Sequence, residues 1–69
     1  EAIIFTGKVI DCMPGAMFKV LLDSVNTEIV GIASGKIRQN RIKILTGDKV
    51  DVEMSPYDLS KGRIVFRHK

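Results

Sequence analysis

The sequence predicts an all-β fold, a small barrel of five strands with one short helix between the third and the fourth. Apolar and polar residues alternate with period two in several short runs, which is typical of strands that bury one face. Turn-forming residues separate these runs, and only one polar segment has the features of a helix. A closed sheet has no exposed edges, so a barrel suits a chain of 69 residues better than a small open sheet.

Two strands are predicted around the turn signal MPG at residues 13–15. The inward face of the first run consists of Ile3, Phe5, Gly7 and Val9. The glycine in this run marks a bend that lets the strand curl. The inward face of the second run consists of Phe18, Val20 and Leu22. We therefore expect Phe18 in the core.

A third strand is predicted over residues 28–33, after a loop that begins at Asp23. Its inward face consists of Ile29, Gly31 and Ala33. Ser34 then has the place of a helix N-cap ahead of the polar segment GKIRQN, which is long enough for one or two helical turns. Ile37 is expected to point from this helix into the core.

The last two strands are predicted on either side of a loop bracketed by SPYD and SKG. After a turn at residues 46–48, the fourth strand places Val50, Val52 and Met54 inside and Lys49, Asp51 and Glu53 outside. Pro56 blocks continuation of the strand, and Gly62 is expected to allow a tight reversal. The last run places Ile64 and Phe66 on one face and Arg63, Val65 and Arg67 on the other.

These elements form one domain over residues 1–69, because so short a chain builds a single modest core. Five short strands with a helix between the third and the fourth favour the oligonucleotide and oligosaccharide-binding (OB) barrel, with an SH3-like barrel as the alternative. No apolar run approaches the roughly 20 residues that a membrane-spanning helix needs, so no membrane segment is expected.

The composition argues against an enzyme, a metal site and a cofactor site. The single cysteine, Cys12, and the single histidine, His68, are too few for structural zinc, so Cys12 is expected to be a small, partly buried apolar residue. His68, close to the chain end, is expected to be exposed, without a catalytic role. Asp51 and Glu53 lie on an open strand without a pocket that would shift their pKa values, and no glycine-rich phosphate-binding motif occurs.

Positive charge is concentrated in the second half of the chain. Residues 1–35 contain two lysines and four acids, whereas residues 36–69 contain nine lysines or arginines and four acids. The helix cluster consists of Lys36, Arg38, Arg41 and Lys43, and the C-terminal cluster consists of Lys61, Arg63, Arg67 and Lys69. Two compact basic patches and a pI near 9.3 indicate a polyanionic partner, with an ordinary solvated surface as the alternative. In the helix cluster, four mutually repelling cations without an intervening acid favour phosphate binding.

Between the fourth and the last strand, Tyr57 and Asp58 have two interpretations. Tyr57 would stack on a base, or it would pack its ring over the end of the barrel. Asp58 is expected to cap its own turn, as turn aspartates commonly do. We favour the structural interpretation for both residues and keep the binding interpretation for the cations that follow them.

The chain closely resembles bacterial-type translation initiation factor one in the sequences of four segments: MPGAMFKV, SGKIRQN, ILTGDKV and SPYDLSKGRIVFR. This family is a single RNA-binding OB barrel. The resemblance covers nearly the whole chain. It implies binding to the aminoacyl (decoding) site of the small ribosomal subunit, through ribosomal RNA and a small-subunit protein. It also implies that the chain blocks premature entry of elongator transfer RNA and assists initiation factors two and three, without catalysis or a cofactor.

Carried over by position, the resemblance implies RNA contacts in three segments. The implied contacts are Lys36, Arg38 and Arg41, then Lys61, Arg63 and Arg67, and the turn at residues 13–17 with Met17. Lys43 is also predicted to contact RNA, because it belongs to the positively charged helix cluster. Two departures from the family pattern are Ile32, where a histidine or tyrosine is usual, and the longer loop at residues 23–28.

Two rival functions remain open at this stage. One is a cold-shock-type nucleic-acid chaperone, which the assignment of Phe5, Phe18 and Phe66 to the interior disfavours, since no aromatic platform is then left for bases. The other is a basic small barrel that binds proteins. The expected state is a monomer in the cytoplasm, with the plastid stroma as the alternative location.

Overall fold

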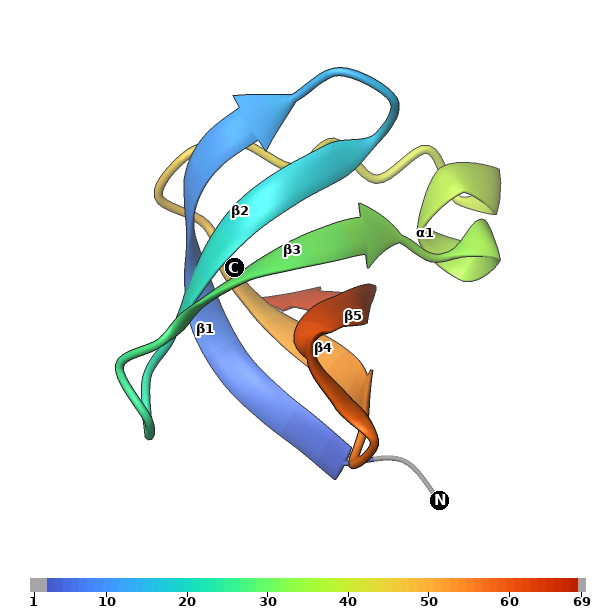
Figure 1. Ribbon diagram of the computed structural model, residues 1–69. Coiled ribbons are helices and arrows are strands. Elements are labelled where there is room, and N and C mark those ends of the chain that lie inside the picture. The colour runs from blue at the N-terminus through green and yellow to red at the C-terminus, as the bar shows by residue number, and fades with distance from the viewer. Residues whose placement is uncertain (1–2, 69) are drawn as a thin grey trace.

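The computed structural model describes residues 3–68, which form five strands and one helix. The elements are β1 (Ile3–Met13), β2 (Met17–Leu22), β3 (Glu28–Ala33), α1 (Gly35–Gln39), β4 (Lys49–Ser55) and β5 (Asp58–His68). Figure 1 shows the strands curling around one another, with α1 at one end of β3. The predicted all-β barrel with a helix between the third and fourth strands is confirmed.

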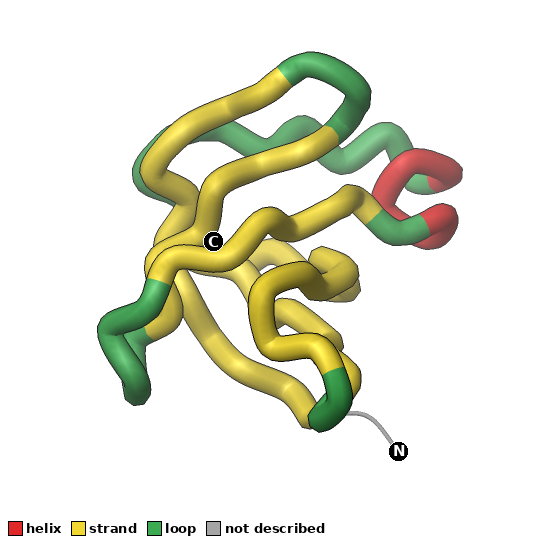
Figure 2. The backbone as a smooth tube through the Cα atoms, in the orientation of Figure 1, coloured by secondary structure: helices red, strands yellow, loops and turns green. Residues whose placement is uncertain are grey.

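The sheet closes in the strand order β1-β2-β3-β5-β4, with β4 also paired to β1. All pairs are antiparallel except β3 with β5, which run parallel. Figure 2 shows that the helix and the loops lie at the ends of the barrel, while strands form its wall. This order, with the helix connecting β3 to β4, is that of the OB barrel.

The core contains the residues that the alternation assigned to it in β2, β3 and β4, except that Phe18 of β2 is only partly buried. Its buried members are Val9, Val20, Leu22, Ile29, Ala33, Ile37, Ile44, Val50, Val52, Met54 and Ile64. Phe5 and Phe18 pack against this core while remaining partly exposed. Ile3, assigned to the same face, is 40% exposed at the start of β1, although its partner Met54 is buried.

A bulge in β5 overturns the predicted face of Phe66. Val52 pairs with Ile64 whereas Asp51 pairs with Phe66, so β5 has one extra residue at Val65. An extra residue reverses the alternation that follows it. Ile64 is therefore fully buried as predicted, but Phe66 faces outward and is 55% exposed. The same reversal separates Arg67 from the face that carries Arg63.

Gly62 does not form the predicted reversal. The chain turns at residues 56–57, and Gly62 lies inside β5 opposite Met54. A Cβ atom at this position would overlap Val52 Cγ1 and would lie 2.9 Å from Met54 Cγ. The glycine is needed because another strand approaches it closely, not because of an unusual backbone angle.

Candidate nucleic-acid interface

Helix α1 presents two cations to solvent because its other face is fixed to the core. The Ser34 hydroxyl accepts a hydrogen bond from the Ile37 backbone N–H at 3.3 Å, as expected of an N-cap. Ile37 is buried, as predicted, and Lys36 and Arg38 are exposed on either side of it. One helical turn is thus enough to orient both side chains outward.

The loop after α1 adds Arg41 and Lys43 to the same surface. Arg41 has a φ of +54°, and the Ile42 N–H donates to the Ile37 carbonyl at 3.1 Å, so the chain folds back against the helix. Both cations are exposed. Within residues 3–68, none of the four cations of the helix cluster lies within ion-pair distance of a carboxylate. Their charge is therefore uncompensated inside the described protein.

The C-terminal cluster is electrostatically different. Arg63 forms an ion pair with Glu53 of β4, and Arg67 Nε donates to Asp48 Oδ2 at 3.0 Å. Lys61 is exposed and has no ion pair within the described residues, and Lys69 lies outside them. The three described members of this cluster are therefore one uncompensated cation and two arginines that already have carboxylate partners.

Met17, Ile32 and Arg63 lie in a row across the outside of three strands. Met17 of β2 pairs with Ile32 of β3, which in turn pairs with Arg63 of β5. Backbone hydrogen bonds join this row to its surroundings: Ala33 N to Ala16 O at 3.0 Å, and Ser34 N to Ile64 O at 3.1 Å. The β1–β2 turn, the end of β3, the start of α1 and Arg63 thus form one continuous surface.

Ile32, which departs from the histidine or tyrosine of the family pattern, is an apolar member of this row. It is 37% exposed between Met17 and Arg63. The surface beside the helix cluster is therefore apolar at its centre and cationic at its edge. Such a surface can contact a sugar or base while cations contact phosphates.

Two exposed aromatic residues correct the sequence interpretation. Tyr57 is 95% exposed and does not pack over the barrel end, and Phe66 is the outward residue created by the bulge. Tyr57 stands at the β4–β5 turn, whereas Phe66 lies near the other end of β5. They do not form one stacking platform, so the cold-shock-type function stays disfavoured for a different reason.

Two other local predictions have opposite outcomes. Asp58 Oδ1 accepts hydrogen bonds from Ser60 N at 3.1 Å and Ser60 Oγ at 2.7 Å, which confirms the turn cap and lowers the pKa of Asp58. Cys12 is exposed instead of partly buried, with its Sγ 3.7 Å from Thr46 Oγ1.

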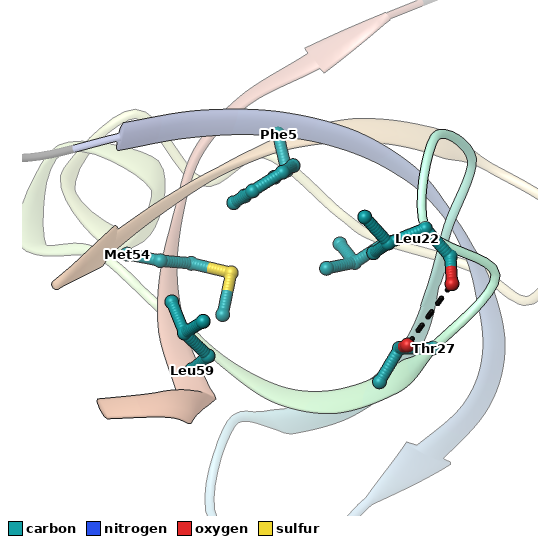
Figure 3. A pocket seen from close by; sticks show the side chains of 6 residues that line it. Phe5, Leu22, Thr27, Met54 and Leu59 are labelled. Atoms are coloured by element: carbon teal, nitrogen blue, oxygen red, sulfur yellow. Dashed lines mark hydrogen bonds between the residues drawn. The ribbon is translucent and has the colours of Figure 1, made fainter. Parts of the chain in front are cut away.

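The end of the barrel away from α1 contains an apolar pocket of about 190 Å³ (Figure 3). It is lined by Phe5, Leu22, Val25, Thr27, Met54 and Leu59. The β2–β3 loop borders it, fastened by a hydrogen bond from Leu22 N to Thr27 O of 2.9 Å. No lysine or arginine lines this pocket, so it is distinct from the cationic surface.

His68, which was predicted to be exposed, is half-buried and forms a hydrogen bond with Asp51. Its Nε2 lies 2.8 Å from Asp51 Oδ1, which also accepts a hydrogen bond from Thr6 Oγ1 at 2.9 Å. Asp51 therefore joins β4 to both of its neighbouring strands. The hydrogen bond from His68 lowers the pKa of Asp51 below its ordinary value of 3.8, burial opposes this shift, and Thr6 adds to it.

This lowered pKa predicts an acid-sensitive contribution of Asp51 to stability. A carboxyl group with a lower pKa in the folded chain stabilises the fold fully above its unfolded value, near 3.8, and loses that contribution as the pH falls below it. We expect Asp51→Asn to lower the urea midpoint at about pH 6, with a smaller difference from the native chain at about pH 2.5. A difference that is the same at both pH values would contradict this assignment.

The described residues offer neither a metal cluster nor a membrane-spanning helix. No group of three or more histidine, cysteine, aspartate or glutamate residues is placed to hold a metal ion in residues 3–68. In the same part of the chain, no helix is long and apolar enough to cross a membrane.

Known proteins resemble this chain over nearly its whole length. The family model described as translation initiation factor 1A / IF-1 matches residues 2–69. Translation initiation factor IF-1 of Rhodopseudomonas palustris is 55% identical over 69 residues, which cover all of this chain and 74% of the relative. The solution structure of translation initiation factor IF-1 from the Wolbachia endosymbiont of Brugia malayi has a TM-score of 0.79 at 44% identity, covering 99% of this chain and 79% of that one.

More distant structures share the fold alone. The crystal structure of YjeQ from Thermotoga maritima has a TM-score of 0.78 at 24% identity, covering 97% of this chain and 23% of that one. The circularly permuted GTPase YloQ has a TM-score of 0.77 at 23% identity, with the same two coverages. The barrel therefore also occurs as one part of larger proteins.

Proposed function

The chain belongs to the translation initiation factor 1A / IF-1 family, and on this basis we propose that it binds the small ribosomal subunit at the aminoacyl (decoding) site. There it contacts ribosomal RNA and a small-subunit protein, and it blocks premature entry of elongator transfer RNA. It acts by occupying the site, together with initiation factors two and three, and performs no covalent step. We further propose that it works as a monomer in the cytoplasm.

The observation that carries this proposal is the uncompensated charge of the helix cluster. Four exposed cations are held on a capped helical turn and the loop that folds back on it, without a carboxylate partner in the described chain. Phosphates of folded RNA supply the missing counter-charge, and the release of bound salt ions makes that contact favourable. The residues assigned to phosphate contacts here are Lys36, Arg38, Arg41 and Lys43.

The surface beside the helix cluster adds further contacts. The Arg63 side chain is 60% exposed even though it pairs with Glu53, so its guanidinium group is accessible to a phosphate. Lys61 extends the cationic edge along β5. Met17 and Ile32 supply the apolar centre, which contacts a sugar or a base.

The proposal is tested by titrating purified small subunits with the fluorescently labelled native chain. Four to six phosphate contacts should lower the affinity by roughly 50- to 2,000-fold between about 50 and 200 mM salt. Transfer RNA bound in the aminoacyl site should displace the chain, whereas transfer RNA confined to the peptidyl site should not. Salt-insensitive binding, or binding together with transfer RNA in the aminoacyl site, would contradict the proposal.

A further inference from the structure

Asp48 holds two separate parts of the chain through one oxygen atom. Its Oδ2 accepts a hydrogen bond from Leu45 N at 2.9 Å and one from Arg67 Nε at 3.0 Å. The side chains of Arg67 and Asp48 are 28% and 20% exposed, and the other ion pairs of residues 3–68 are more exposed. Water therefore screens this pair less than the others.

The pair fixes one end of the loop that carries Arg41 and Lys43. Residues 40–48 connect α1 to β4 without forming a strand or helix of their own. At the helix end, the loop is held by the hydrogen bond from Ile42 N to Ile37 O. At the β4 end, it is held by Gly47 N to Val9 O at 2.7 Å, by Val9 N to Asp48 O at 2.8 Å, and by the Asp48 side chain. The two cations lie between these attachments.

Arg67 does not share the surface of the other predicted RNA contacts. After the bulge at Val65 it pairs with Val50, whose side chain is in the core, whereas Arg63 pairs with Ile32 on the outer surface. Its Nε donates to Asp48 and its side chain is mostly covered. The position and partner of Arg67 therefore differ from those of the exposed cations.

We propose that Arg67 is a positioning residue for RNA binding: through Asp48 it fixes the turn at residues 45–48, so that Arg41 and Lys43 are ordered before RNA arrives. An ordered loop loses less conformational entropy on binding, and this raises affinity without a contact to RNA. The inference rests on the proposed function, because it concerns the strength of the same interaction.

Asp48 provides a test in which direct contact and positioning predict opposite signs. Removing an acid from a protein that binds a polyanion should strengthen binding if only overall charge matters. We instead expect Asp48→Ala and Arg67→Gln each to weaken small-subunit binding by about three- to ten-fold. The double variant should bind no more weakly than either single variant, and its affinity should depend on salt with the same slope as that of the native chain.

Asp11→Ala is the matched control, because it removes an exposed acid without an ion pair in residues 3–68. This variant should bind as tightly as the native chain or more tightly.

Amide hydrogen exchange in the unbound protein tests the ordering of the loop directly. Exchange at residues 41–48 should become faster in Asp48→Ala and Arg67→Gln, while exchange in the core strands changes little. Asp48→Asn keeps an oxygen that can accept from Leu45 N–H, so it tests the charge without removing that hydrogen bond.

The outcomes separate the two proposals. Tighter binding by Asp48→Ala would show that overall charge determines the effect of Asp48, and a salt slope lowered by roughly 0.7 to 0.9 in Arg67→Gln would show a direct phosphate contact. Either result would overturn the positioning role. Unchanged loop exchange in both variants would also overturn it. Failure of the native chain to bind small subunits would instead refute the proposed function, and the exchange experiment would still decide whether Arg67 orders the loop.

Discussion

Replacing Lys36, Arg38 and Arg41 together with glutamine is expected to lower affinity for the small ribosomal subunit by roughly 100-fold near 0.1 M salt. Each phosphate contact contributes roughly 0.7 to 0.9 to the log–log dependence of affinity on salt, so the slope should fall by about 2 to 3. The side chains are exposed, and none has an ion pair in the described chain, so the fold should be retained. Fluorescence anisotropy over a salt series measures both quantities.

The matched control removes three cations from elsewhere on the barrel, Lys8, Lys19 and Lys49. Lys19 and Lys49 have carboxylate partners in Glu28 and Asp23, so their charges are already compensated. This variant has the same net charge as the helix-cluster variant but should keep most of the native affinity and slope. Equal losses in both variants would mean that net charge, and not the helix cluster, determines binding.

Ile64→Ala is expected to destabilise the fold by about 2 to 5 kcal/mol, which is the usual cost of such a cavity in a core. Ile64 is fully buried, pairs with Val52 across the β4–β5 ladder and with Ala33 across the parallel β3–β5 ladder. A domain of 69 residues has a total stability of only about 3 to 10 kcal/mol. The variant should therefore be partly or largely unfolded at room temperature, as urea denaturation would show.

Ile64→Val provides the graded control, because it removes a single methylene group and should cost about 0.5 to 1.5 kcal/mol. Both midpoints should shift without a change in the denaturant slope, since the surface exposed on unfolding stays the same. A loss below about 1 kcal/mol for Ile64→Ala would mean that the barrel interior collapses around the cavity and is not rigidly packed.

Much of the barrel was predictable because the features that define it depend on residues close together in the sequence. The alternation of Val50, Val52 and Met54 with polar residues, and the N-cap at Ser34, depend only on neighbours along the chain. The helix cluster belongs to the same class, since four cations within eight residues lie on one short helical turn and its loop. These features agree with the structure.

Two predictions about β5 were wrong for a common reason. The pattern assigned Phe66 to the interior and Gly62 to a reversal, but the bulge at Val65 turns Phe66 outward and the close approach of β4 requires Gly62. Both features depend on how β5 is matched to the neighbouring strand. The alternation of residues within β5 does not show where a bulge interrupts its pairing with β4.

The sequence alone determined the all-β class, most of the core and the cationic helix, because side-chain period, capping and local charge density act over a few residues. Only the tertiary structure decided which cations are uncompensated. Arg63 meets Glu53 ten residues away and Arg67 meets Asp48 nineteen residues away, and neither pairing is visible in a charge count. Ion pairing depends on distances in space, which strand register and closure of the barrel set, and so it divides two clusters that look alike in the sequence.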